Sequence, residues 1–156
     1  MKVNEIVILA NLGELKVYEA APRDLEAEAG LKPENVKLDL IDNRDYVATH
    51  WKLHEIVTDQ AGRFKGGSQG RGTFSRGSIG EKHTIEAEVE EKVVQQIAKD
   101  ISDIVNEKGV KWYLAMPETI YGRIIGKVSP AAQEKLVKSL EKDLMKVDKT
   151  ELVELF

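Results

Sequence analysis

The stretch TIEAEVEEKVVQQIAKDISDIVNEKG, from Thr84 to Gly109, decides the fold of this chain. Its apolar residues recur at spacings of three and four, which is the period of one face of an α-helix. We predict a helix from about Thr84, its N-cap, to about Lys108, with Gly109 in the position after the helix that favours glycine. The residues of the predicted apolar face are Ile85, Val89, Val93, Val94, Ile97, Ala98, Ile101, Ile104 and Val105.

Three β-strands are predicted before this helix. Val3–Ala10 and Glu14–Ala21 form a hairpin around the turn Asn11–Gly13. Val36–Asn43 alternates apolar and polar residues and is the third strand. The β-branched and aromatic residues of Asp45–Val57 favour an extended, partly exposed segment.

Strands and helices alternate in the rest of the chain. Short turns make the first three strands antiparallel, whereas crossovers through helices make the last two parallel. We therefore predict one α/β domain over residues 1–156, with a ribonuclease H-like mixed five-stranded sheet and helices packed on it. The later predicted elements are a strand at Val110–Met116, helices at Pro117–Lys127 and Ser129–Lys138, a strand at Ser139–Lys146 and a last helix capped by Asp148.

Composition limits the classes of function. The chain has no cysteine, which excludes disulfides and thiolate chemistry. No run of 18 apolar residues is present, so we expect no membrane span, and we expect a cytoplasmic protein. The net charge of −4 gives no general attraction to nucleic acid, so any such attraction must be local.

The segment GRFKGGSQGRGTFSRGS, Gly62–Ser78, carries four basic residues and no acid. Arginine and lysine can neutralise phosphates, glycines let the backbone approach a strand, and phenylalanines can stack on bases. The alternatives are a solvated loop, mobile from about Gly66 onward, and contact with another anionic partner. The candidate RNA-binding residues are Arg63, Phe64, Lys65, Gly66, Gly67, Gln69, Arg71, Phe74 and Arg76.

Other sites are weaker. Gly77–Thr84 lacks the spacing of a phosphate-binding P-loop. His50 and His54 lie four apart in a segment read as extended, so we predict neither a metal site nor a cofactor. A two-metal nuclease needs carboxylates on the first and fourth strands, where only Glu5 and Glu118 lie nearby, at or beyond the strand ends.

The start of the helix after the fourth strand is another candidate site. Ligands of open α/β sheets bind beyond the carboxyl ends of strands, often at helix N-termini. Glu118 in the first turn of Pro117–Gly126 disfavours an anion there, and Arg123 could restore the attraction. The alternative is a helix that simply packs on the sheet.

Three motifs resemble the bacterial family called "protein required for attachment to host cells". They are TDQAGR (Thr58–Arg63), WYLAMPETIYGRI (Trp112–Ile124) and LEKDLMKVDKTELVELF (Leu140–Phe156). The family in turn resembles the middle domain of archaeal and eukaryotic class I release factors. In that domain, a loop before the long helix carries a Gly-Gly-Gln motif that enters the peptidyl transferase centre.

The corresponding residues here are Gly66-Gly67-Ser68-Gln69-Gly70. Ser68 separates the glutamine from the glycine pair, so Gln69 is only a weak catalytic candidate. The leading hypothesis is a non-catalytic RNA- or ribosome-associated accessory factor. The alternatives are a protein-interaction module affecting surface attachment or stress physiology, and a peptidyl-tRNA hydrolase-like release or rescue factor.

Overall fold

The computed structural model describes residues 1–46 and 74–156, with the side chains of the long helix described from residue 86 onward. The elements are, in chain order, β1 (Ile6–Ala10), β2 (Glu14–Pro22), α1 (Leu25–Glu28), β3 (Val36–Asp45), α3 (Phe74–Lys108), β4 (Trp112–Ala115), α4 (Glu118–Ile125), α5 (Pro130–Glu134), β5 (Leu136–Leu140) and α6 (Lys149–Leu155).

The strands form one five-stranded sheet in the order β3-β2-β1-β4-β5. β2 pairs with β1 and β3 in antiparallel fashion, whereas β4 pairs with β1 and β5 in parallel. This confirms the predicted mixed α/β sheet with its antiparallel and then parallel strands. The narrower ribonuclease H-like class stays a prediction.

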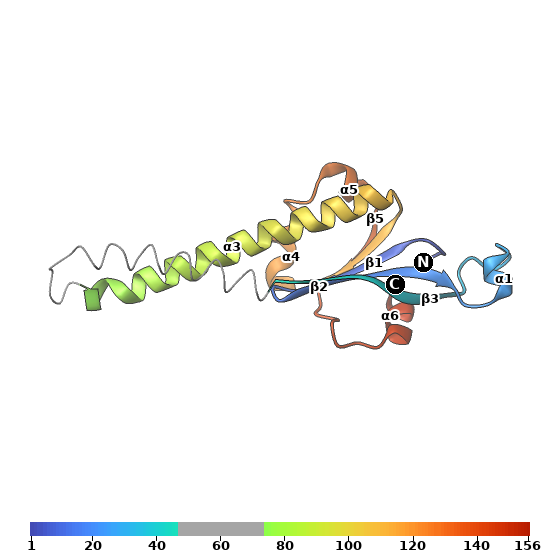
Figure 1. Cartoon of the computed structure of the whole chain (residues 1–156), viewed down its shortest axis with the longest axis horizontal. Helices are drawn as coiled ribbons and strands as arrows, with labels where there is room; N and C mark the ends of the chain where they lie inside the picture. The colour runs from blue at the N-terminus through green and yellow to red at the C-terminus, as the bar shows by residue number, and fades with distance from the viewer. Residues whose placement is uncertain (47–73) are drawn as a thin grey trace.

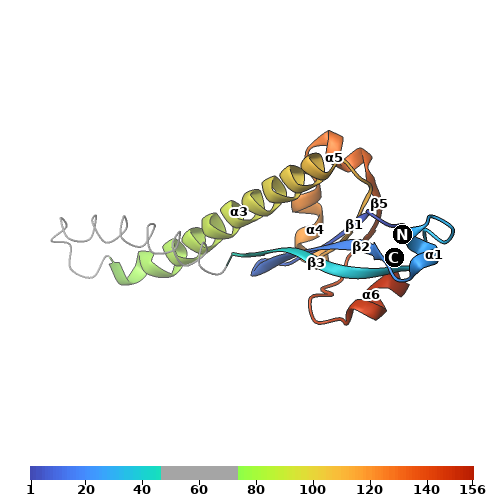
Figure 2. The same ribbon diagram turned by 45° about the vertical axis from the view of Figure 1, so that its right-hand side comes forward.

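Helices cover both faces of the sheet. α3, α4 and α5 lie over one face, and the short α6 lies over the other (Figures 1 and 2). Two buried apolar clusters correspond to these two layers. α1 belongs to the connection between β2 and β3 and lies at the end of the sheet (Figure 1).

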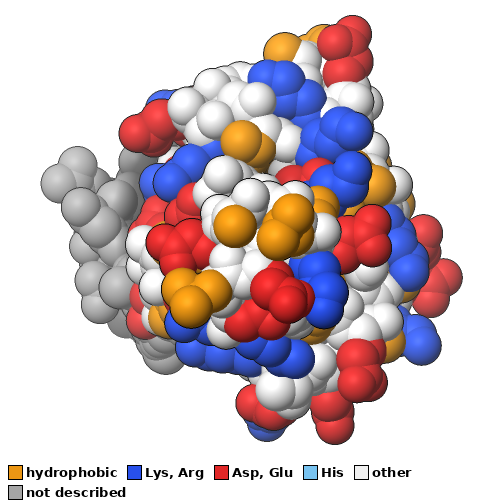
Figure 3. Space-filling model, turned by 90° about the vertical axis from the view of Figure 1, so that its right-hand side faces the viewer, with side chains coloured by type: hydrophobic (Ala, Val, Ile, Leu, Met, Phe, Trp, Pro, Cys, Tyr) orange, Lys and Arg blue, Asp and Glu red, His pale blue; other side chains and the backbone are white. Residues whose placement is uncertain are grey.

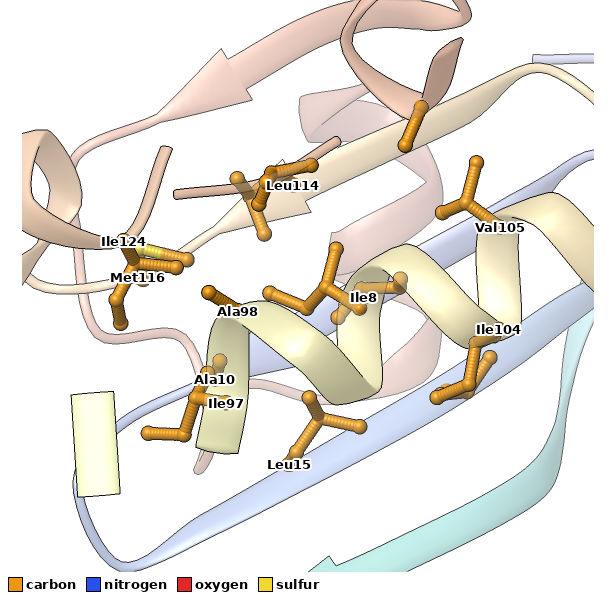
Figure 4. Packing of buried hydrophobic residues seen from close by; sticks show 14 of the residues in the cluster. Ile8, Ala10, Leu15, Ile97, Ala98, Ile104, Val105, Leu114, Met116 and Ile124 are labelled. Atoms are coloured by element: carbon orange, nitrogen blue, oxygen red, sulfur yellow. The ribbon is translucent and has the colours of Figure 1, made fainter. Parts of the chain in front are cut away.

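The larger cluster joins α3 to the sheet. Ile97 and Ala98 of α3, Ile8 of β1 and Leu114 of β4 all lie in the layer between the helix and the sheet (Figure 4). The α3 residues of this cluster recur at spacings of three and four, and its β1 residues, Ile6, Ile8 and Ala10, alternate, as amphipathic elements require. Val93 and Ile97 of the predicted helix face are fully buried in this cluster with Ile6, Ile8, Leu114 and Met116, and Val89 is fully buried outside it.

The smaller cluster lies under α6. Leu152 of α6 is fully buried in it, together with Val7 and Leu9 of β1. Tyr113 of β4 meets Phe156 edge to face, with ring centroids 5.7 Å apart. The predicted closing helix with Asp148 at its N-cap is therefore present and seals the second face.

α3 begins at Phe74, so the predicted start at Thr84 is wrong. Once part of a helix is held by packing, each added residue gains a hydrogen bond without a new nucleation step. The glycines at 77 and 80 weaken this extension by about 1 kcal/mol each relative to alanine but do not stop it. The predicted apolar face begins at Ile85, and the helix extends beyond it towards the N-terminus.

The last strand also differs from its prediction. β5 is Leu136–Leu140 rather than Ser139–Lys146, and α5 ends at Glu134. Trp112 explains the early end of the helix. Its indole donates to the Ala132 carbonyl at 2.7 Å, and its backbone N–H donates to the Lys135 carbonyl at 3.1 Å. These bonds draw the chain alongside β4 as soon as one helical turn is complete.

β3 is an edge strand and carries an irregularity. Val17 of β2 pairs with Asp42, and the next residue, Tyr18, pairs with Leu40. Ile41 is therefore an extra residue in β3, the arrangement of a β-bulge. The predicted strand Val36–Asn43 is present and continues to Asp45.

None of the helices in the described ranges, 1–46 and 74–156, combines the length and apolar character needed to cross a bilayer. α3 has the length, but charged residues recur along it.

We expect Val93→Asp to lower the free energy of unfolding by about 3 kcal/mol or more, because it buries an unpaired carboxylate. Gln95→Asp, on the exposed side of the same turn, is the control and should stay within about 0.5 kcal/mol of the parent. Urea denaturation followed by circular dichroism measures both. A Val93→Asp protein as stable as the parent would show that the α3 face is assigned wrongly.

Candidate functional site: the arm of α3 and its base

Most of the predicted RNA-binding residues lie outside the described residues. Those are Arg63, Phe64, Lys65, Gly66, Gly67, Gln69 and Arg71. Phe74 and Arg76 are placed in the first turn of α3, so the predicted loop is wrong over residues 74–78, which are helical. The rest of the segment that we predicted to be mobile, residues 66–73, lies outside the described ranges.

The N-terminal part of α3 projects beyond the sheet. Val89 is the first buried residue among the α3 side chains that the structure describes. From Phe74 to Val89 the helix rises by about 22 Å, at 1.5 Å per residue. Both ribbon views show this part, residues 74–88, extending past the end of the sheet (Figures 1 and 2). We call residues 74–88 the arm.

A buried polar cluster joins the part of α3 that covers the sheet to the end of β3. Asp100 of α3 is 6% exposed, the only buried polar or charged residue among those whose burial the structure describes. Its carboxylate accepts from the Tyr46 hydroxyl at 2.5 Å and from Gln96 Nε2 at 2.9 Å. Arg44 Nη1 lies 2.7 Å from the same carboxylate. We call Arg44, Tyr46, Gln96 and Asp100 the Asp100 cluster.

The cluster is electrostatically complete. Burial, and then the hydrogen bond to Asp100, raise the pKa of Tyr46 far above its ordinary value, so Tyr46 stays a phenol and a donor. Arg44 supplies the positive charge that a buried carboxylate requires and is also bonded to Asp42 at 3.3 Å. All buried side-chain polar atoms of the described residues have partners. This pattern is that of a structural clamp rather than of a reactive site.

α4 is tied to the base of the arm by exposed ion pairs. Arg123 contacts Glu90 at 3.1 Å and Glu91 at 2.9 Å, and Lys127 contacts Glu91 at 2.9 Å. The hydrogen bonds from Arg123 and Lys127 lower the pKa of Glu91 to about 2. Arg123 therefore does not restore an attraction for anions at the start of α4, because its charge is already matched by two glutamates.

The start of α4 has the features of a packed helix. Pro117 occupies the N-cap without a side-chain hydrogen bond, and Ile120 and Ile124 are buried against the core. The Met116 N–H donates to the Leu140 carbonyl at 3.1 Å, which joins β4 to β5 at this edge. These contacts favour the packing interpretation over a ligand site.

The nuclease carboxylates are not brought together. Glu5 accepts from the Lys2 backbone N–H at 2.8 Å and from the Tyr113 hydroxyl at 3.0 Å, so it holds the N-terminal turn. Across residues 1–46 and 86–156, no group of three or more histidine or acidic side chains could hold a metal ion. His50 and His54 lie outside the described ranges.

The Asp100 cluster was missed from the sequence. One signal was present, because Asp100 falls three residues after Ile97 and therefore on the apolar side of the helix. A single carboxylate among β-branched residues needs a buried partner. Nothing in the sequence pattern identifies Arg44 and Tyr46 as those partners, since they come from a distant strand.

A scan against protein-family models finds a match over residues 6–155 to the family described as "Protein required for attachment to host cells". The match includes every strand and helix described above. A comparison with curated proteins gives no significant match.

The ion pairs of Glu91 predict a pH dependence. The folded pKa of about 2 lies below the ordinary 4.5, so the unfolded chain binds the proton first as the pH falls. The stabilisation is thus fully present above about pH 4.5 and is lost between about pH 4.5 and pH 2. Denaturation of the parent and Glu91→Gln should differ at pH 7 and converge towards pH 2.

Glu107→Gln, at an exposed position of the same helix, is the matched control. A difference between parent and Glu91→Gln that stays constant from pH 7 to pH 2 would contradict the ion-pair assignment.

Proposed function

We propose that this chain, which belongs to the family of proteins required for attachment to host cells, is a non-catalytic accessory factor that binds RNA or the ribosome. The contact is made by the basic segment Gly62–Ser78, whose last five residues begin α3.

The observation that carries this proposal is the arm. α3 continues about 22 Å beyond its first described buried residue, and this part of the helix extends past the end of the sheet (Figures 1 and 2). The extension provides reach, because the residues at its start stand away from the sheet (Figure 1). Such reach suits entry into a confined site on a large partner.

Charge distribution supports the same function. The chain has a net charge of −4, yet Gly62–Ser78 contains four basic residues and no acid. The exposed described residues of the arm next to the sheet include Glu86 and Glu88. Positive charge is thus concentrated in one segment of the sequence, which can attract a phosphate backbone although the chain as a whole is acidic.

The resemblance to release-factor middle domains supports a ribosomal partner, and the departure from their glutamine motif argues against catalysis. A ribonuclease H-like class for the sheet is part of this proposal. Ser68 separates Gln69 from Gly66-Gly67, so the glutamine is displaced from the position that the release-factor motif gives it. We therefore expect no peptidyl-tRNA hydrolysis by the protein.

A second candidate function is a protein-interaction module, and the connection between β2 and β3 favours it. Leu25 and Leu31 are 81% and 78% exposed. Neither leucine contributes to the core, so their apolar surface is available to a partner. α1 lies at the opposite end of the molecule from the arm (Figure 1).

The connection that carries these leucines is well fixed. The Asp24 carboxylate accepts from the Ala27 N–H at 2.8 Å and from Asn35 Nδ2 at 2.7 Å. Lys32 and Glu26 form an ion pair at 2.6 Å. Gly30 has φ +82°, a backbone conformation that residues other than glycine rarely adopt. A fixed loop loses little conformational freedom on binding, which favours recognition.

The charges around the leucines indicate the kind of partner. Hydrophobic side chains are interspersed with acidic and basic ones on this end of the molecule (Figure 3). Acids predominate on the connection, so an apolar pocket with a basic rim is the complementary surface. Its exposed acids are Asp24, Glu26, Glu28 and Glu34, against Arg23 and Lys32.

The RNA hypothesis is tested by salt dependence. Changing Arg63, Lys65, Arg71 and Arg76 to alanine removes up to about four phosphate contacts, and the slope of log K against log salt should become shallower by about 0.7 per contact. Binding to a fluorescent single-stranded RNA and to purified ribosomes measures the slope. The control changes four exposed lysines elsewhere, Lys37, Lys99, Lys142 and Lys146.

A parent protein without salt-sensitive binding to either probe would remove the RNA hypothesis and leave the interaction module.

The interaction module makes a different prediction. Leu25→Ser with Leu31→Ser should abolish capture of a protein partner at both low and high salt, because an apolar interface depends little on ionic strength. Stability should change by no more than about 0.5 kcal/mol, since both side chains are exposed. Pull-down from cell lysate with mass spectrometry, in parallel with the four-alanine variant, measures the effect.

A partner that the four-alanine variant loses and the double serine variant retains would assign recognition to the basic segment instead.

A further inference from the structure

We propose that Asp100 is a positioning residue that sets the axial register of α3 on the sheet, and that it thereby fixes how far the arm reaches. This inference concerns the geometry of the arm and holds whichever partner the arm binds. It starts from the contrast between the apolar and polar contacts of α3.

The main apolar row of α3 specifies its register weakly. Val93, Ile97, Ile101 and Val105 follow one another at spacings of four, are all β-branched and are all fully buried. A shift of the helix by one turn towards its C-terminus would replace each of these side chains by another of the same kind, although Glu90 would then take the buried position of Val94. Hydrophobic packing tolerates such exchanges when volume is roughly conserved.

The Asp100 cluster is not interchangeable in this way. One turn before Asp100 lies Gln96, and one turn after it lies Ile104. Ile104 opposite Tyr46 would leave the buried hydroxyl without an acceptor, and Gln96 there would remove one of the two carboxylates that pair with Arg44. A buried polar contact that only one alignment satisfies is the kind of feature that fixes register in packed helices.

The sheet side of the cluster is itself fixed. The Tyr46 N–H donates to the Gly13 carbonyl at 2.8 Å, so Tyr46 is tied to the turn between β1 and β2. Through Tyr46 and Arg44, the antiparallel half of the sheet is the reference against which α3 is aligned.

The other polar contacts of α3 are poorer references. Through its described side chains, α3 reaches α4 by way of Arg123 and Lys127, and it reaches the start of α5 by way of Ser129. These partners are themselves helical elements packed on the sheet. The pair between Lys108 and Glu19 of β2 is 3.8 Å long and partly exposed, so it contributes little.

The arm's reach can be measured with spin labels. The chain contains no cysteine, so Glu86→Cys on the arm and Lys37→Cys on β3 give two unique sites, both exposed. Pulsed electron–electron double resonance on the protein with these two labels and no other change should give one narrow distance distribution. Asp100→Leu should broaden the distribution or displace it towards a distance shorter by about 5 Å, as Gln96 replaces Asp100 at Tyr46.

Asp103→Leu, the same substitution at an exposed position of the same helix, should keep the parent distribution. Tyr46→Phe removes only the hydroxyl and should broaden the distribution even if Asp100→Leu fails to fold. A lower melting temperature with an unchanged distance, in whichever of the two variants folds, would overturn the proposal, because Asp100 would then stabilise the fold without aligning it. The measurement contains no RNA, so its outcome is independent of RNA binding.

Discussion

Burial of one face of α3 against β1 and β4 determines both how the chain folds and where its exposed features lie. Val93, Ile97 and Ile101 are fully buried, and they cover the strands that join the antiparallel half of the sheet to the parallel half. β1 and β4 are parallel, so their connection must cross over the sheet through a helix. The same helix that makes this crossover possible extends past the sheet as the arm.

Elements with strong local signals could be predicted from the sequence. β1 and β4 are apolar throughout, and α3 has a long stripe of period 3.6, so their type and order were apparent. The boundaries that failed depend on distant partners. β5 starts at Leu136 because Trp112 bonds to Ala132 and Lys135, and nothing near Leu136 signals that pairing.

The same distinction between local signals and distant contacts applies to the candidate site. A basic, glycine-rich segment is visible in composition alone, and its assignment to RNA stays a prediction. The Asp100 cluster is defined by contacts between β3 and α3, which are far apart in sequence, so only the structure identifies it. Arg123 is a further example, because the sequence left an anion site and a packed helix both open, and its ion pairs with Glu90 and Glu91 favour the packed helix.

The bulge at Ile41 has a consequence for the behaviour of the protein at high concentration. A ten-residue edge strand presents backbone donors and acceptors that could template strand addition by another molecule. The extra residue bends β3 and interrupts that regular row, and charged side chains occupy much of the remainder. These charges are Lys37, Asp39, Asp42, Arg44 and Asp45. The edge is thereby protected from amyloid-like pairing, although Leu40 and Ile41 remain partly exposed on it.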